Sequence, residues 1–485
     1  MDYSQFLLMT PEVSLALTLI VLLVADLVMG EKSKQYFQPL ALVLFAAHTA
    51  YNFCSCSGCC TMVGQTEAFS GMYITSNIHV FVKNMLNLGT LLVFLFSFEW
   101  NKKENKNHIA EFYLLMISTL FGMYLMISSG DFLLFYIGLE TASIPMATLV
   151  ALNKKRNESA EAAAKYILTA AFSSAVMLFG ISLVYGSCGG SLYFCDVAKN
   201  FTAEPFQILA MIFFMAGVAF KISLVPFHLW TADTYQGAPT SVTAYLSVMS
   251  KGSAAFAFMV IMWKAFSNVE VQSTLVSWTN ILWWLIVITI TVGNIFAIRQ
   301  KNLKRFLAFS SISQAGYIML GLMSGTAAGM GSMVYYILVY LFTNLGAFGI
   351  ISNIEDKSGK VGMDDYNGLY ETNPKMAVIM MLAMFSLAGI PPFAGFWSKF
   401  FIFASAAQAG QYLLVFIALA NTIISLYYYL LVVKAMFINK SDSPIATFKS
   451  DKMSLIGITV CTVGFLFLGF ISQIYEQIIE WSFRI

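Results

Sequence analysis

The chain has 485 residues, of which 59% are hydrophobic and 11% are charged. Soluble globular domains carry roughly 25% charged residues, so this composition excludes a soluble protein and favours an integral membrane protein. The formal net charge is +2, and the basic residues form no single patch, which argues against nucleic acid as a partner. A β-barrel would show alternating segments of roughly ten residues, and the sequence does not have them.

Fourteen stretches of about 20 mostly apolar residues are long enough to cross a bilayer as helices. They predict an all-α polytopic membrane protein with helices 1 to 14 at residues 8–29, 39–62, 74–98, 110–128, 131–152, 162–187, 206–230, 239–263, 276–298, 305–325, 330–352, 375–407, 411–437 and 453–475. The start of the chain, Met1 to Glu12, lacks a basic segment, so we expect helix 1 to be a true span rather than a cleaved signal.

The lysines and arginines outside these helices lie mainly in the loops that follow odd-numbered helices. Loops after even-numbered helices, together with the C-terminus, hold only Lys199, Lys264 and Arg484. The positive-inside rule therefore predicts that the basic loops are cytoplasmic and that both termini lie outside. For a bacterial protein this predicts a multi-pass protein of the cell inner membrane with periplasmic termini.

The basic residues inside the predicted helices are all lysines: Lys83, Lys221, Lys251, Lys399 and Lys434. A lysine can lose its proton when it is removed from water, whereas an arginine stays charged. A lysine at a helix centre costs on the order of 3 kcal/mol on membrane-insertion scales, so Lys221, Lys251 and Lys399 predict a function. Lys83 and Lys434 lie nearer helix ends and could extend to the outer and cytoplasmic surfaces, although Lys434 stays a candidate for a proton path.

Glu140 lies at a similar depth, in the middle of predicted helix 5. A buried carboxylate needs a cationic partner, and Lys221 is our first choice. A change in the separation of this pair would shift the proton affinity of the lysine and so load or unload a proton. His228 follows Lys221 by seven residues, which is two turns of continuous helix or about 10 Å. It could relay protons toward the cytoplasm, and a hydrogen-bonded interface histidine is the alternative.

Prolines interrupt two of the predicted helices. Pro226 follows Lys221 in helix 7, and Pro391 and Pro392 precede Lys399 in helix 12. Proline removes a helical hydrogen bond, and transporters place ion sites at such broken helices. Both broken helices are therefore candidate ion sites.

Helices 6 and 11 share a Tyr-Ile-Leu sequence and a later Phe, and the two proline breaks recur at nearly the same spacing. We interpret helices 4–8 and 9–13 as two five-helix repeats, which an odd number of helices makes inverted. The predicted regions are residues 1–109 with helices 1–3, residues 110–266 with the first repeat, residues 267–440 with the second repeat, and residues 441–485 with helix 14.

A group of cysteines crowds the end of predicted helix 2: Cys54, Cys56, Cys59 and Cys60. Cys188 and Cys195 follow helix 6. All six lie outside under the predicted orientation, in an oxidising compartment, which favours disulfides over a zinc site or an iron–sulfur cluster. Cys188–Cys195 is the predicted disulfide, and the connectivity of the other four stays open.

The segments Val225–Trp230, Asp233–Thr243 and Ser250–Lys251 closely resemble the signature of the antiporter-like subunits of respiratory complex I. These subunits are related to the subunits of Mrp-type cation/proton antiporters. Asn302–Ser311 and Gly389–Phe396 are also similar to family segments. The resemblance covers roughly residues 110–440.

Bacterial complex I contains three such subunits, called L, M and N. The L subunit has a long extension that this chain lacks, and the M subunit typically has Glu where this chain has Lys399. The chain therefore most resembles the N-type members. Many of those carry His in helix 10 where this chain has Gln314, which cannot titrate and puts a proton carrier at that position in doubt.

The resemblance implies a proton-translocating membrane subunit of an NADH–quinone oxidoreductase, in which other subunits oxidise NADH and reduce quinone. It implies a proton path through Glu140, Lys221, Lys251 and Lys399, with His228 as a further candidate from the residues themselves. The chain has no Gly-rich dinucleotide loop and no convincing cluster ligands. We therefore expect no cofactor, no metal and no redox site in this chain.

The expected partners are the lipid bilayer and other membrane subunits of complex I: the neighbouring antiporter-like subunit M, small membrane subunits and the lateral helix of subunit L. Two alternatives stay open. The chain could be a subunit of an Mrp-type cation/proton antiporter, or it could be a structural spacer between neighbouring membrane subunits.

Overall fold

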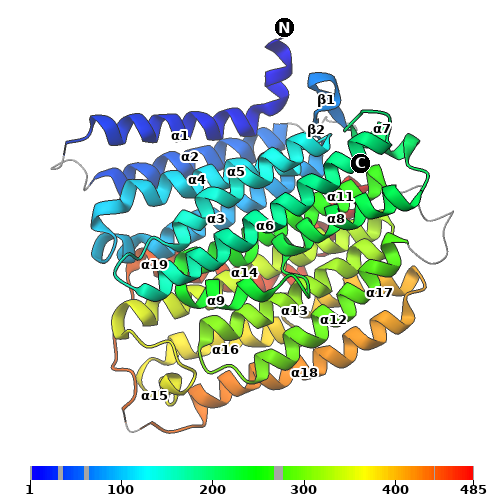
Figure 1. Ribbon diagram of the computed structural model, residues 1–485. Coiled ribbons are helices and arrows are strands. Elements are labelled where there is room, and N and C mark those ends of the chain that lie inside the picture. The colour runs from blue at the N-terminus through cyan, green and yellow to red at the C-terminus, as the bar shows by residue number, and fades with distance from the viewer. Residues whose placement is uncertain (1–2, 31–35, 59–64, 267–276, 442, 484–485) are drawn as a thin grey trace.

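The computed structural model describes residues 3–30, 36–58, 65–266, 277–441 and 443–483. Its long helices lie side by side, and the N-terminus, the strands β1 and β2, the short helix α7 and the C-terminus gather at one end of the bundle (Figure 1). We call this the hairpin end. The opposite end carries the loops rich in lysine and arginine, and we call it the basic end.

The N-terminal part forms a group of helices with a small antiparallel hairpin, in which Thr66 pairs with Thr75. Its elements are η1 (Tyr3–Met9), α1 (Thr10–Val28), α2 (Phe37–Gly58), β1 (Thr66–Ala68), η3 (Phe69–Gly71), β2 (Tyr73–Thr75), α3 (Asn77–Lys103) and η4 (Lys106–His108).

The next part corresponds to the first predicted repeat, and η5 in it is a single π-helical segment. Its elements are α4 (Ile109–Ile127), α5 (Phe132–Val150), α6 (Asn157–Ser187), α7 (Phe194–Asn200), α8 (Pro205–Ile222), α9 (Leu229–Gly237), α10 (Thr240–Tyr245), η5 (Leu246–Ser250) and α11 (Lys251–Ala265).

The last part corresponds to the second predicted repeat and the C-terminal helix. Its elements are α12 (Trp278–Ile298), α13 (Leu303–Met323), α14 (Ala327–Ser358), η7 (Asp364–Tyr366), α15 (Leu369–Thr372), α16 (Pro374–Ala388), α17 (Ala394–Gln408), α18 (Tyr412–Phe437), α19 (Lys452–Phe467), η8 (Leu468–Phe470) and α20 (Ser472–Ser482).

The helices are sorted by burial. The apolar stretches of α13 and α14 are wholly buried, whereas only 22% of the corresponding stretch of α1 is buried. A helix that is apolar on all sides belongs inside a bundle or in lipid, so α13 and α14 form the centre and α1, α6, α18 and α19 the rim. The polar site described below is built around this centre.

Twelve of the described helices are long and apolar enough to cross a membrane. The other two predicted spans correspond to α2 and to the pair α16 and α17, whose halves have 15 residues each. The predicted all-α polytopic membrane protein is thereby confirmed. Predicted helix 14 extended too far, because α19 ends at Phe467 and the chain then forms the separate, amphipathic helix α20.

Candidate functional site

The first helix break lies where Pro226 predicts it. Helix α8 ends at Ile222, Ser223 adopts a left-handed backbone with φ of 70°, and α9 begins at Leu229. The indole Nε1 of Trp230 donates to the carbonyl of Phe220 at 3.1 Å. The same carbonyl accepts from the Ser223 backbone amide at 3.0 Å, so backbone and side-chain donors together satisfy the end of α8.

Lys221, which is 3% exposed, occupies the end of α8. Its Nζ donates to the Ser143 hydroxyl at 2.7 Å and to the Tyr166 hydroxyl at 3.3 Å. Glu140 on α5 is half-buried and accepts a hydrogen bond from Ser174 on α6. The expected direct contact of Glu140 with Lys221 is not formed. Ser143, which binds Lys221, follows Glu140 by three residues, or about one helical turn of α5. Lys221 and Glu140 are thus held apart, Lys221 by the Ser143 hydroxyl and Glu140 by the Ser174 hydroxyl.

His228 does not lie two helical turns from Lys221, contrary to the prediction. The helix breaks after Ile222, and His228 lies in the turn that precedes α9. His228 is half-buried, and its Nδ1 is buried without a partner among the described residues. A proton relay through His228 stays a prediction.

Lys251 follows the π-helical segment η5 directly and is 3% exposed. Its Nζ donates to the Ser311 hydroxyl on α13 at 2.8 Å and lies 5.2 Å from the ring centroid of Tyr235. A cavity of about 10 Å³ borders Lys251, Ser311, Ser247 and Tyr340. That volume is about the minimum for one water molecule, and Lys251, Ser311, Ser247 and Tyr340 are the polar residues on an otherwise apolar lining.

The second break, at Pro391 and Pro392, also lies where the sequence predicts it. Helix α16 ends at Ala388, and α17 begins at Ala394. Lys399 on α17 donates to the carbonyls of Leu387 and Ala388, each at 2.9 Å. These carbonyls close the C-terminal end of α16, which carries partial negative charge, so the break forms a site for a cation.

Tyr340 on α14 lies between the two central lysines, and sequence reasoning missed it because a tyrosine in an apolar helix resembles packing. It lines the Lys251 cavity and a second cavity of about 10 Å³ beside Lys399. Its hydroxyl is buried and has no partner among the described residues. Gln314 borders the second cavity, accepts from Tyr336 and donates to Tyr429 at 3.1 Å.

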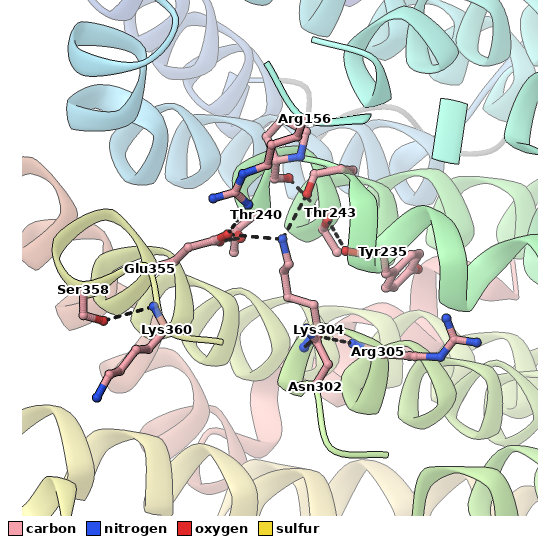
Figure 2. Close-up of polar contacts among 12 residues, drawn as sticks. Arg156, Tyr235, Thr240, Thr243, Asn302, Lys304, Arg305, Glu355, Ser358 and Lys360 are labelled. Atoms are coloured by element: carbon pink, nitrogen blue, oxygen red, sulfur yellow. Dashed lines mark hydrogen bonds and ion pairs between the residues drawn. The ribbon is translucent and has the colours of Figure 1, made fainter. Parts of the chain in front are cut away.

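A larger cavity of about 420 Å³ opens at the basic end. Glu355 at the end of α14 borders it and accepts from Thr240, while Lys304 lies 3.5 Å and Arg156 3.1 Å from its carboxylate. Figure 2 shows Lys304 directed at Glu355, whereas the next residue, Arg305, points the other way. Sequence reasoning placed Lys304 in a basic loop, and only the packing of distant helices reveals this ion-pair cluster.

The remaining two intramembrane lysines, Lys83 and Lys434, lie in different surroundings. Lys83 is 0% exposed and forms an ion pair with Glu12 of α1, so it does not extend to the surface. Lys434 lies in the last turn of α18 with an exposed side chain, outside the buried axis. The position does not support a place for Lys434 on the proton path, and its candidacy stays a prediction.

The predicted Cys188–Cys195 disulfide is not formed. Both cysteines are free: Cys188 is buried 3.8 Å from Gln207 Nε2, whereas Cys195 is exposed on α7. The two side chains face different environments. Of the remaining cysteine cluster, Cys59, Cys60 and the side chain of Cys56 lie outside the described residues. Across the described ranges, no three His, Cys, Asp or Glu side chains are grouped to hold a metal, and the absence of a cofactor stays a prediction.

Comparisons with known proteins agree with this arrangement. Residues 129–425 match the family model described as NADH:quinone oxidoreductase/Mrp antiporter, TM. NADH-quinone oxidoreductase subunit N of Phocaeicola vulgatus is 52% identical over 98% of both chains. The corresponding protein of Azobacteroides pseudotrichonymphae is 52% identical over 100% of this chain and 99% of its own.

Two solved structures are similar across nearly the whole chain. A chain of respiratory complex I from Thermus thermophilus is 30% identical, with a TM-score of 0.79, over 96% of this chain and 97% of its own. A chain of the Mrp complex from Dietzia sp. shares the fold, with a TM-score of 0.86 and 19% identity over 99% and 97% of the two chains. The full-length identity separates the two families, and this chain belongs to the family of antiporter-like N subunits of NADH-quinone oxidoreductase.

Proposed function

We propose that this chain moves protons along a buried axis through Glu140, Lys221, Lys251 and Lys399, as subunit N of a bacterial NADH–quinone oxidoreductase. One observation carries the proposal. Lys221, Lys251 and Lys399 are at most 5% exposed, and their hydrogen bonds in the described structure go to hydroxyls and carbonyls. A buried ammonium without a carboxylate in contact binds its proton weakly, because burial disfavours the charged form, so these lysines can release a proton.

Glu140 supplies the adjustable charge in this scheme. When its carboxylate approaches Lys221, the charged form of the lysine is favoured, and when it withdraws to Ser174 the proton is released. The half-buried position of Glu140 leaves room for such movement. Once Lys221 is neutral it no longer repels a positive charge on Lys251, so Lys251, the next lysine of the axis, can take up the released proton.

The step from Lys251 to Lys399 passes Tyr340. The two cavities that border Tyr340 each have room for about one water, which would join its hydroxyl to both ammonium groups. A hydroxyl both donates and accepts, so it can pass a proton without holding charge. Gln314 in the same region is neutral and orients the Tyr429 and Tyr336 hydroxyls.

The orientation and the two-repeat organisation belong to this proposal. The basic end faces the cytoplasm and the hairpin end, with both termini, faces the periplasm, in agreement with the positive-inside rule. Both five-helix units contain a helix that ends in a left-handed residue, Ser223 in one and Gly389 in the other, beside a buried lysine. This likeness supports two inverted units, at 110–266 and 267–440, that each supply half of the path.

The expected partners of this chain are neighbouring membrane subunits: the antiporter-like subunit M, the small membrane subunits and the lateral helix of subunit L. Glu140 shares a face of α5 with Leu133, Ile137 and Ile144, which are 44%, 46% and 60% exposed. A carboxylate that opens onto an apolar surface is expensive in lipid. A neighbouring subunit on this face would cover it and could move the Glu140 charge.

The test uses Lys221→Ala and Glu140→Gln in the assembled complex, reconstituted in liposomes. We expect both variants to retain assembly and to lose proton pumping driven by NADH oxidation. Lys434→Ala is the control, because it removes an intramembrane lysine that is exposed. Normal pumping in both axis variants would refute the proposal, and the absence of NADH dehydrogenase subunits from the purified assembly would refute the assigned complex.

A further inference from the structure

A second charged centre lies in the N-terminal helices, outside both five-helix units. Lys83 of α3 and Glu12 of α1 form an ion pair, with side-chain exposures of 0% and 2%. The Tyr73 hydroxyl of strand β2 donates to Glu12 Oε2 at 2.9 Å and accepts from Lys83 Nζ at 3.1 Å. The tyrosine therefore bridges the two charged groups, in addition to their direct contact.

The centre continues into a buried polar stripe on α3. Asn87 and Thr90 follow Lys83 at spacings of four and three residues, so all three lie on one helical face, and each is 0% exposed. Asn87 accepts from Tyr124, whose ring lies 5.6 Å from Lys83 Nζ, and the Nδ2 of Asn87 is buried without a partner among the described residues. An unpartnered amide at this depth is a place for a water molecule.

Helix α3, which carries the stripe, packs against α10, which ends at Tyr245 shortly before Lys251. Thr90 donates to the carbonyl of Leu86 at 2.8 Å, and the Tyr245 hydroxyl accepts from Thr119 at 2.9 Å. Two residues after Tyr245, Ser247 borders the Lys251 cavity and accepts from Asn344 at 2.7 Å. Buried polar side chains thus recur between the Lys251 cavity and Lys83, and water would have to join those that do not touch. Glu12, in the first turn of α1, lies beyond them toward the hairpin end.

Helix packing alone does not account for this centre. Buried ion pairs can usually be replaced by apolar residues at no loss of stability, since desolvation offsets the attraction of the charges. Helix α1 already packs through Leu15 and Leu22, which are both 0% exposed. Ionisable residues within a membrane span indicate function by default, and here both partners are identified.

We propose that Glu12, Tyr73 and Lys83 form a proton-exit centre that connects the Lys251 cavity to the aqueous phase at the hairpin end. In the transfer, an ammonium proton of Lys83 passes to the Tyr73 oxygen, and the Tyr73 hydroxyl proton passes to Glu12. This leaves a neutral amine and a neutral carboxylic acid, so the net charge of the centre is unchanged. Glu12 then releases its proton outward, and Lys83 takes up another from water on the α3 stripe.

The inference rests on the proposed proton-pumping role, and two variants test it in the reconstituted complex. Tyr73→Phe removes one oxygen and leaves the direct ion pair in place. Lys83→Arg keeps the ion pair but cannot give up its proton. Tyr366→Phe is the control, because Tyr366 is also fully buried, but its hydroxyl has no partner among the described residues. The readout is the number of protons moved per NADH oxidised, measured on complexes whose subunit composition is verified.

We expect a lower proton yield in Tyr73→Phe and Lys83→Arg and the wild-type yield in Tyr366→Phe. If the pair merely holds α1 against α3, both variants will pump as the wild type does, and a wild-type yield in either assembled variant overturns the proposal. If Lys83→Arg fails to assemble, Tyr73→Phe decides alone. Lys221→Ala is measured in parallel: pumping lost there but retained in the exit variants refutes the exit centre and leaves the main axis standing.

Discussion

Gly389→Ala tests whether the second helix break positions a working lysine. Gly389 has φ of +85°, and a left-handed conformation costs an L-residue about 1–2 kcal/mol. A Cβ at this position would lie 2.9 Å from Lys399 Cδ and 3.4 Å from its Nζ, so the side chain must move. Lys399 would then lose its contacts with the carbonyls of Leu387 and Ala388, and charged hydrogen bonds contribute about 1.5–3 kcal/mol each.

Gly410→Ala is the matched control. Gly410 lies just after α17, the helix that carries Lys399, with φ of +79°, and a Cβ there would meet no heavy atom within 4 Å. Both variants should lose about 1–2 kcal/mol from backbone strain, measured by thermal unfolding in detergent. Only Gly389→Ala should also lose NADH-driven proton pumping in liposomes. Equal pumping in the two variants would refute the claim that the α16 carbonyls position Lys399 for its function.

Three further predictions concern stability and the limits of the site. Trp230→Phe removes the indole donor to the Phe220 carbonyl, which keeps its backbone hydrogen bond from Ser223, so thermal unfolding should show a loss of about 0.5–1.5 kcal/mol; an unchanged unfolding temperature would show that the indole hydrogen bond does not stabilise the break. Asp233 is partly exposed, so Asp233→Asn should cost at most about 1 kcal/mol. Burial raises the pKa of the Asp233 carboxyl, but Lys165 and Arg305 outweigh it and hold the pKa below its usual value. The stabilisation is therefore present above the pKa of the unfolded carboxyl and is lost as pH falls through the lowered pKa, so wild type and Asp233→Asn should become equally stable in acid; a constant difference would contradict this. Lys434→Ala should change stability by no more than about 0.5 kcal/mol and leave pumping intact, because this side chain is exposed.

The sequence was sufficient for features that depend on local chemistry. Pro226 and the Pro391–Pro392 pair predicted both helix breaks, because proline disrupts a helix wherever it falls in its interior. Lys221, Lys251 and Lys399 were identified because a lysine far from helix ends stands out in an apolar segment. Each of these lysines is buried in the structure and donates hydrogen bonds to neutral groups.

Contacts between distant segments could not be predicted in the same way. Glu12 and Lys83 are 71 residues apart, and no local pattern in the sequence links them. Tyr340 becomes a candidate for proton transfer only in the folded protein, where it lines the cavities beside Lys251 and Lys399, two lysines from other helices. His228 was placed by helical periodicity that the break itself cancels.

Lys251 provides the most direct test of the central claim, because it lies between the other two lysines of the axis. The measurement is the number of protons moved per NADH oxidised by the reconstituted complex that carries Lys251→Met, which keeps an unbranched apolar chain in the site. If protons pass through the buried lysines, the complex will assemble with its full set of subunits and its proton yield will fall. A wild-type yield from the fully assembled Lys251→Met complex would contradict the account.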